Sequence, residues 1–435
     1  MKIAMVNVYF FPEMIGGAEW YVYNISRELV KMGHEVHVFT GKYPEREGLS
    51  YPDVVEGIKI HRVPLVLDIT YRLKLWKNLA DEIVKERPDI VHTYDYAQWH
   101  SYSALKAASR LRAPSILTVF DVHSVIPRPW YKRAPMRVLD RICGSLVLRK
   151  ADLVLVRAPN LVPFLLKMGV KRDRVLVTPS GIRPEALARA EGSHFVVKYG
   201  ITGRPIVLYL GRLHPSKGLR HLFRAAPSVL REFPTTTFVL VGPEEGAFKG
   251  ELIEIARRLG FERNVVFAGP IYDMAEKMSA YASCDVFVLP SGYEGTSQSI
   301  FEAMAQGRPI VATNRGGIPF QVEDGKEGLL VEFGDEVGLA KAILRLLSDA
   351  EAANEMGRRA RLKVEGFTYP ALAKRIEEIY ALQLAGRPGE EGVTRTTWDK
   401  LLKTATSGEA PQRPMSSPTV ARAPPASSQT LGRPS

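Results

Sequence analysis

Short apolar runs alternate with amphipathic stretches along most of the chain. In the first 180 residues the apolar runs predict buried strands at Ile3–Phe10, Glu35–Thr40, Asp89–Tyr94, Pro114–Phe120, Ala151–Val156 and Arg174–Thr178. Helical patterns separate most of these runs, as in Gly17–Met32, which Gly33 ends. Near-continuous apolar strands that alternate with helices predict a parallel sheet covered on both faces.

The same alternation starts again after residue 200. Pro205–Leu210 is a predicted strand, and a helix is predicted near Leu219–Glu232. Further strands are predicted at Thr237–Val241, Asn264–Ala268, Asp285–Leu289, Pro309–Thr313 and Gly328–Val331. The chain is therefore expected to be an α/β protein with two doubly wound sheets in series. Ligands of such sheets bind outside the carboxyl ends of the strands, so two facing domains would enclose a cleft.

The 435-residue chain contains 46% hydrophobic and 24% charged residues, which is an ordinary composition for a soluble globular protein. The two cysteines, Cys143 and Cys284, cannot form a disulfide framework, and no apolar stretch approaches the roughly 20 residues that span a bilayer. A cytoplasmic protein is expected. The Pro- and Ser-rich end of the chain has almost no large apolar side chains, which predicts a mostly disordered tail over 385–435.

The net charge of +12 indicates an anionic partner. Half of this charge gathers in 128–150, where Arg133, Arg137 and Arg141 follow one another at helical spacing beside apolar residues. A basic amphipathic helix can lie on an anionic membrane surface, although a core-packed helix with a solvated basic face is an equal alternative. Flotation with anionic vesicles separates the two. Nucleic-acid binding is not expected, because interleaved aromatic residues and a known module are missing.

Two strand-loop-helix segments carry candidate anion-binding groups. Gly16 and Gly17 open a helix after the first strand, where backbone N–H groups can approach an anion closely. Gly211-Arg212-Leu213 follows Pro205–Leu210, and Arg212 and Lys217 flank the loop. A guanidinium and an ammonium at the carboxyl end of a strand could clamp a diphosphate, whereas two solvated surface cations are the simpler reading.

The segment after Asp285–Leu289 is the most informative. Glu294 lies in the loop, Thr296 or Ser297 is a natural N-cap, and Glu302 falls about two turns into the following helix. Two carboxylates spaced on the order of 10 Å apart along the rim suit a nucleotide sugar, one at the sugar hydroxyls and the other at the ribose hydroxyls. The spacing alone is weak evidence, but its place after a buried strand strengthens it.

Together these segments closely resemble the large family of retaining glycosyltransferases with the GT-B fold, glycosyltransferase family 4. The matching pieces are Phe11–Glu19, Gly211–Leu213 with Lys217-Gly218, Asp285–Ser291, Glu294-Gly295, Glu302–Ala305, Gly307–Thr313 and Gly316-Gly317, in order and over residues 1 to about 380. The resemblance implies two Rossmann-like domains facing across a cleft. The expected bounds are 1–183, with a returning helix at 369–384, for the acceptor-side domain, and 184–366 for the nucleotide-sugar domain.

The resemblance implies a hexosyltransferase that moves a sugar from a nucleotide diphosphate sugar to a lipid, a lipid-linked sugar or a glycan, with retention and without metal or cofactor. Arg212 and Lys217 would bind the diphosphate, Gly16 and Gly17 would approach it, Glu294 would contact the sugar and Glu302 the ribose. The remaining donor-binding residues are expected to be Thr296, Ser297 and Gln298. Membrane-associated acceptors are common in the family, which favours a peripheral membrane enzyme at the inner face.

The candidate catalytic residues are Glu294, His123 and Asp121. Many relatives have Thr-x-His at the end of the strand near Thr118. Here Phe120 takes the place of that histidine, and His123 stands three residues later, with Asp121 before it. A loop histidine without a catalytic role is an equal alternative for His123. No metal site is expected: an Asp-x-Asp pair is missing, and His34 and His37 are three apart at the start of a strand, where alternation places them on opposite faces.

Two other functions remain open at this point. A sugar-nucleotide epimerase of the same architecture would bind a similar donor without an acceptor. A sugar-nucleotide-binding regulator would bind the donor without catalysis. The presence of five residues argues against it: Gly17, Arg212, Lys217, Glu294 and Glu302. The products distinguish the three functions, because they are a glycoside, an epimer or an unchanged donor.

Overall fold

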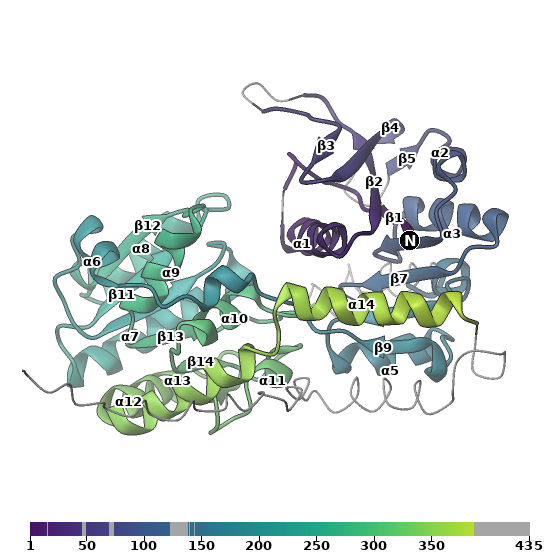
Figure 1. The fold of residues 1–435 in the computed structure, drawn as a ribbon. Coiled ribbons are helices and arrows are strands. Elements are labelled where there is room, and N and C mark those ends of the chain that lie inside the picture. The colour runs from purple at the N-terminus through teal and green to yellow at the C-terminus, as the bar shows by residue number, and fades with distance from the viewer. Residues whose placement is uncertain are drawn as a thin grey trace, which may run out of the picture.

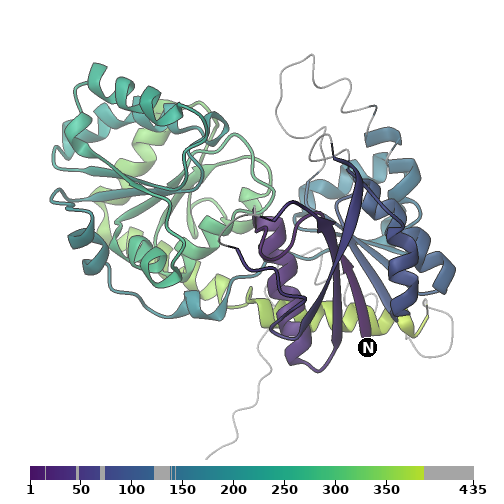
Figure 2. The ribbon, with the colours of Figure 1, turned by 90° about the horizontal axis from the view of Figure 1, so that it is seen from above.

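The computed structural model describes residues 1–14, 16–45, 49–68, 74–121, 138, 140–142 and 144–386. They form two α/β units side by side (Figure 1). Viewed from above, the first unit, in purple and blue, and the second, in teal and green, remain separate bodies joined by short crossings (Figure 2). The predicted α/β class with two doubly wound sheets is confirmed.

The first sheet has the order β3-β4-β2-β1-β6-β7-β8-β9, with β5 paired to β4. Its strands are β1 (Lys2–Val6), β2 (Glu35–Lys42), β3 (Val54–Val55), β4 (Ile58–Asp68), β5 (Lys74–Trp76), β6 (Ile90–Tyr94), β7 (Ser115–Val119), β8 (Leu153–Val156) and β9 (Val175–Val177). Pairing is parallel except at β3–β4 and β4–β5. The apolar-run pattern did not predict β3 to β5, because β4 is half exposed and carries Arg62 and Pro64 between its apolar residues.

The second sheet is parallel throughout, with the order β12-β11-β10-β13-β14-β15. Its strands are β10 (Ile206–Leu210), β11 (Thr237–Val241), β12 (Val265–Gly269), β13 (Val286–Leu289), β14 (Ile310–Thr313) and β15 (Gly328–Val331). Each lies within a residue of its predicted position. The central strands are buried on both faces, and such strands carry apolar side chains at nearly every position.

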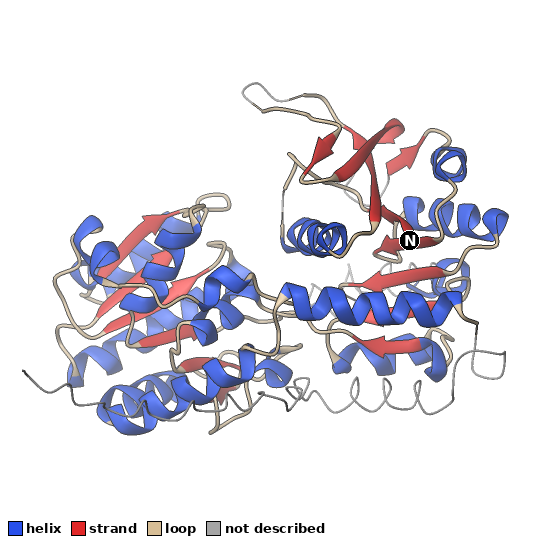
Figure 3. Cartoon of the chain, viewed as in Figure 1, coloured by secondary structure: helices blue, strands red, loops and turns tan. Residues whose placement is uncertain are grey.

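Helices cover both faces of each sheet (Figure 3). Those of the first unit are α1 (Gly17–Lys31), α2 (Leu79–Glu86), α3 (Trp99–Leu111) and α5 (Val162–Lys167). Those that follow are α6 (Ser193–Lys198), α7 (Leu219–Glu232), α8 (Phe248–Arg258), α9 (Met274–Ser283), α10 (Gln298–Ala305), α11 (Ile318–Gln321), α12 (Glu336–Ser348), α13 (Ala350–Val364) and α14 (Tyr369–Leu384). Short 3-10 and π turns are η1 (Gly144–Leu148), η2 (Pro159–Leu161), η3 (Arg172–Arg174), η4 (Pro184–Leu187), η5 (Pro215–Lys217) and η6 (Glu262–Asn264).

Each sheet has its own hydrophobic core. The core of the second unit takes its residues from Ile182 to Val364, whereas the main core of the first unit includes both its own strands and α14. The α14 helix lies along the first sheet (Figure 1), where the Tyr380 hydroxyl contacts His92 Nδ1 at 2.6 Å. The chain therefore returns to the first unit after completing the second.

Three sequence predictions fall wholly or largely outside the described residues. The predicted tail is one, since the description ends at Gly386. The predicted basic helix at 128–150 is described only in part; there Val138, Ile142 and Leu146, at helical spacing, are exposed. His123 is the third. Membrane contact therefore stays a prediction. Within the described ranges, no helix combines the length and apolarity needed to cross a bilayer.

Candidate active site

The sequence-predicted donor residues gather where the order of the second sheet reverses. Strands β10 and β13 are parallel neighbours, but the chain continues from β10 outward to β11 on one side and from β13 to β14 on the other. The loops that follow two such strands diverge and leave a crevice at the carboxyl edge of the sheet. The loop after β10 carries Arg212 and Lys217, and the loop after β13 carries Glu294.

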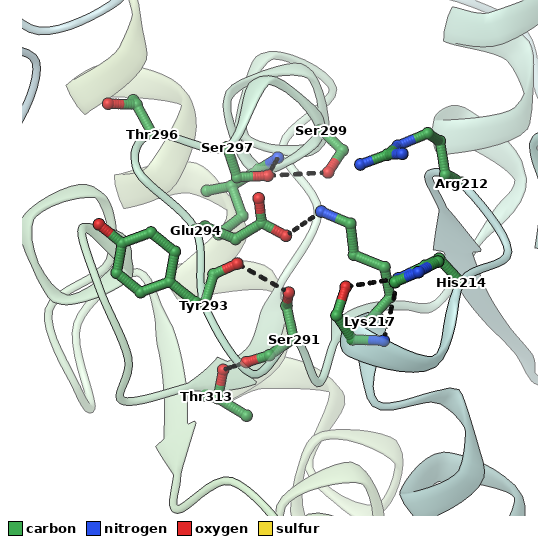
Figure 4. Close-up of polar contacts among 12 residues, drawn as sticks. Arg212, His214, Lys217, Ser291, Tyr293, Glu294, Thr296, Ser297, Ser299 and Thr313 are labelled. Carbon is green, nitrogen blue, oxygen red and sulfur yellow. Dashed lines mark hydrogen bonds and ion pairs between the residues drawn. The ribbon is translucent and has the colours of Figure 1, made fainter. Parts of the chain in front are cut away.

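An ion pair joins these two loops. Lys217 Nζ donates to Glu294 Oε1 at 2.7 Å, and the two side chains are 18% and 14% exposed. Figure 4 shows the ammonium reaching across the crevice to the carboxylate. A pair with this little exposure is screened less than a surface pair, because water around it is limited. The structure thus brings together Lys217, which is predicted to bind the diphosphate, and Glu294, which is predicted to contact the sugar.

Arg212 lies at the exposed side of the same crevice. Its Nη1 donates to Glu245 Oε2 at 2.7 Å, and its side chain is 60% exposed. In Figure 4 the guanidinium extends toward Ser299 and the Lys217 ammonium. The side chains of Arg212 and Lys217 therefore extend into the same crevice. Because the ion pair between Arg212 and Glu245 is exposed, replacing Glu245 by an anionic ligand should cost little free energy.

The loop after β13 ends in a capped helix. Ser297 is the N-cap of α10, and its Oγ accepts from the Ile300 amide at 3.4 Å. Thr296 and Gln298 contact the first unit: the Thr296 carbonyl accepts from Arg157 Nη2 at 2.9 Å, and Gln298 Nε2 donates to the Gly181 carbonyl at 3.3 Å. These predicted donor residues hold the loop against the facing domain in this structure, and their contact with a donor stays a prediction.

Glu302 is buried, at 4% exposure, and both of its oxygens have protein partners. Oε1 accepts from Lys277 Nζ at 2.6 Å, and Oε2 accepts from the Tyr281 hydroxyl at 3.0 Å. The sequence reading missed both partners, because they lie on α9, 25 and 21 residues away. A ribose contact by Glu302, which stays a prediction, would require it to share these bonds.

Gly16 and Gly17 form the N-terminus of α1 in the facing domain. The Gly16 amide donates to Glu19 Oε2 at 2.7 Å, so a carboxylate of the chain itself occupies one of the free amides. Burial raises the pKa of Glu19, although hydrogen bonds from the Glu19 and Gly16 amides oppose this. Among the described residues, no atom lies within 4 Å of a Cβ added at Gly17. Packing against these residues therefore does not require glycine there, whereas close approach of a ligand would.

Asp121 follows β7 in the first unit and faces the loop after β13 in the second. Its Oδ1 accepts from the Tyr293 hydroxyl at 3.2 Å, across 172 residues of sequence. Arg157 lies nearby, with its guanidinium over the ring of Phe120 at 5.2 Å. The sequence reading missed Arg157 and Tyr293, yet Arg157 directly follows strand β8, a position that could have marked it. Burial raises the pKa of Asp121 to about 6, against the opposing charge of Arg157.

This raised pKa predicts how stability changes with pH. The folded chain holds the Asp121 proton more tightly than the unfolded chain, whose carboxyl titrates near 3.8. The protonated Asp121 carboxyl therefore contributes to the free energy of unfolding fully below about pH 3.8, and this contribution is lost as the pH rises through about 6. Asp121→Asn stays neutral, so its melting temperature should gain on that of the wild type between pH 4 and 7. Thermal unfolding at several pH values measures this; a constant difference would contradict the assigned environment.

A cavity of about 710 Å³ also lies between the two units. Its lining includes Arg157 and Pro179 from the first unit and Thr296, Gly317 and Phe320 from the second. The described lining does not include Lys217 or Glu294. We therefore place the candidate donor site at the ion pair and the reversal of strand order, not in this cavity.

Two family models match the chain, one in each unit. The model described as Glycosyltransferase Family 4 matches residues 15–186, and the model described as Glycosyl transferases group 1 matches residues 195–363. The first covers the segment from Gly16 to β9, and the second covers the crevice residues.

Curated relatives match nearly the whole chain. Glycogen synthase of Mycobacterium tuberculosis is 28% identical over 414 residues, covering 90% of this chain and 96% of that protein. D-inositol 3-phosphate glycosyltransferase of Corynebacterium diphtheriae is 27% identical, covering 87% and 94%. Sulfoquinovosyl transferase SQD2 of Arabidopsis thaliana is 28% identical, covering 81% and 68%.

Solved structures share the fold. Sucrose-phosphate synthase of Thermosynechococcus elongatus superposes with a TM-score of 0.69 at 24% identity, covering 89% of this chain and all of that chain. HepE of Anabaena in complex with UDP-glucose gives a TM-score of 0.67 at 21% identity, covering 88% and 99%. These neighbours have the GT-B fold, which confirms the predicted architecture.

Proposed function

The chain belongs to glycosyltransferase family 4, and from this premise we propose that it transfers a hexose-type sugar from a nucleotide diphosphate sugar to an acceptor with retention of configuration. The proposed acceptor is a lipid, a lipid-linked sugar or a glycan. The observation that carries the proposal is the Lys217–Glu294 ion pair at the reversal of strand order, beside the N-terminus of α10.

The chemistry of this arrangement fits departure of a nucleoside diphosphate. Negative charge grows on the leaving diphosphate in the transition state, and preorganised cations that face it lower the barrier. Lys217 and Arg212 supply that charge, and the amides at the start of α10 and at Gly16-Gly17 add partial positive charge. Glu294 positions the Lys217 ammonium and accepts from the sugar hydroxyls. In this proposal the leaving phosphate takes the proton of the acceptor, which attacks from the same face.

A ligand panel tests the donor. HepE of Anabaena has been solved with UDP and with UDP-glucose, so uridine nucleotides come first, followed by GDP, ADP and their sugars. We expect one nucleotide family to raise the melting temperature, because a ligand at 100 times its Kd adds about 2.7 kcal/mol of stability. Lys217→Ala should reduce the shift. The absence of a shift with any nucleotide at millimolar concentration would contradict the proposed site.

Product analysis tests the reaction itself. With the donor identified, incubation with glycan and lipid acceptors should yield a glycoside with the anomeric configuration of the donor. An epimerised nucleotide sugar would assign the chain to the alternative reaction, and an unchanged donor with every acceptor would favour a binding role.

A further inference from the structure

A cluster of metal-ligating side chains lies on the first sheet, on a different unit from the Lys217–Glu294 pair. It consists of His37 on β2, His61 on the neighbouring strand β4, and Glu86 at the end of α2. One ligand atom from each lies within 4.8 Å of the others. We propose that His37, His61 and Glu86 bind a divalent transition metal of the zinc class, which cross-links strands β2 and β4 of the first sheet to α2.

The two distances from His37 to the other ligands are close to those of a tetrahedral site. His37 Nδ1 lies 2.8 Å from His61 Nε2 and 3.3 Å from Glu86 Oε2. Ligand atoms at about 2.0–2.1 Å from a tetrahedral zinc ion lie about 3.3 Å from one another. The two imidazoles would therefore separate by about half an ångström to admit the ion. Two imidazole nitrogens and one carboxylate oxygen suit zinc, with water in the fourth position.

A second carboxylate orients the buried ligand. Glu35 Oε1 lies 2.9 Å from His37 Nε2. A carboxylate there holds the proton on Nε2, so that the lone pair of Nδ1 faces the cluster, as in carboxylate–histidine–metal arrangements. Lys59 Nζ lies 2.6 Å from the same Glu35 oxygen and holds the carboxylate in place beside His37.

The charges around the cluster identify a competitor. Lys2 Nζ, from β1, lies 2.9 Å from Glu86 Oε2, the oxygen that faces His37. The ammonium therefore competes with an ion for Glu86 and repels it, so that removing the ammonium should strengthen metal binding. Glu82 adds negative charge near His61, and both line a surface cavity of about 420 Å³ that gives the ion a path to the cluster.

The sequence reading did not find this cluster. It considered His37 only with His34, whose Nε2 in the structure contacts Glu377 on α14 at 2.8 Å. The partner of His37 instead comes from a strand 24 residues away that the apolar pattern did not predict. Local spacing cannot reveal ligands that three separate elements supply.

Zinc titration of the untagged full chain, after dialysis against EDTA, tests the proposal. Competition with a chromogenic chelator should show one equivalent bound, and His61→Gln should weaken binding at least about tenfold. His34→Gln is the matched control and should bind as the wild type does. Substitution with Co²⁺ should give visible bands without a thiolate charge-transfer band. Unchanged affinity in His61→Gln, or lost binding in His34→Gln, would overturn the assignment.

A second variant keeps the test decisive where His61→Gln fails to fold. Lys2→Met removes the competing ammonium and leaves all three ligands in place, so we expect zinc to bind at least about threefold more tightly than in the wild type. Zinc should also raise the melting temperature of the wild type and of Lys2→Met. Equal or weaker affinity in Lys2→Met would overturn the proposal.

Discussion

Replacing Lys217 by alanine should lower kcat/KM for the sugar donor by about 10²- to 10³-fold in a chain that still folds. The substitution removes a cation that would face the leaving diphosphate. It also leaves the Glu294 carboxylate, 14% exposed, without its 2.7 Å partner. Arg212→Ala should have a smaller effect, because that side chain is 60% exposed and loses charge-assisted bonds of about 1.5–3 kcal/mol at most.

Steady-state kinetics with a matched control separates this effect from a general loss of charge. Lys198 forms a similar ion pair with Glu276 at 2.6 Å, but on the surface, so Lys198→Ala should change kcat/KM less than about twofold. A double-mutant cycle with Glu294→Gln should show coupling of about 0.5–3 kcal/mol, because the two side chains act in contact. Wild-type kinetics in Lys217→Ala would remove the diphosphate assignment and with it the proposed mechanism.

Gly317→Ala should cause the second largest loss of activity, although glycine has no side chain that could take part in the reaction. Its amide donates to the Glu294 carbonyl at 2.7 Å, and an added Cβ would lie 1.7 Å from the Gly295 carbonyl oxygen. The methyl group must push the Glu294 loop away from α11. We expect a loss of about 1–3 kcal/mol in stability. We also expect a fall in kcat/KM of about 10²-fold, since a shift of 1 Å in a positioned group has this effect.

Gly250→Ala is the control for this substitution. Gly250 lies within α8, where an added Cβ would meet no atom of the described part of the chain within 4 Å. Alanine there should leave kcat/KM unchanged and stabilise the helix by about 0.5–1 kcal/mol. Melting temperatures and steady-state kinetics of the two variants measure both effects. Wild-type activity in Gly317→Ala would show that the position of the Glu294 loop does not matter.

Both predictions concern residues that the sequence pattern identifies, Lys217 and Gly317, but they depend on contacts that the pattern cannot predict. Lys217 and Glu294 stand out because each follows a buried apolar strand, and the carboxyl ends of parallel strands share one edge. Their pairing across 77 residues depends on β10 and β13 being neighbours, which the strand order decides. The sequence marks Glu302 in the same way, but the structure pairs both of its carboxylate oxygens with residues on α9 and not with another predicted site residue.

The sequence by itself determined the doubly wound α/β architecture and which loops carry the candidate chemistry. Burial on both faces leaves a mark at every position of a strand, so local pattern suffices. Only the tertiary structure decided the half-exposed strand β4, the Asp121–Tyr293 contact and the His37–His61–Glu86 cluster. Each depends on which distant segments become neighbours. The packing of whole helices and strands against one another decides which segments become neighbours, and this packing produces no periodic pattern of hydrophobic residues in the sequence.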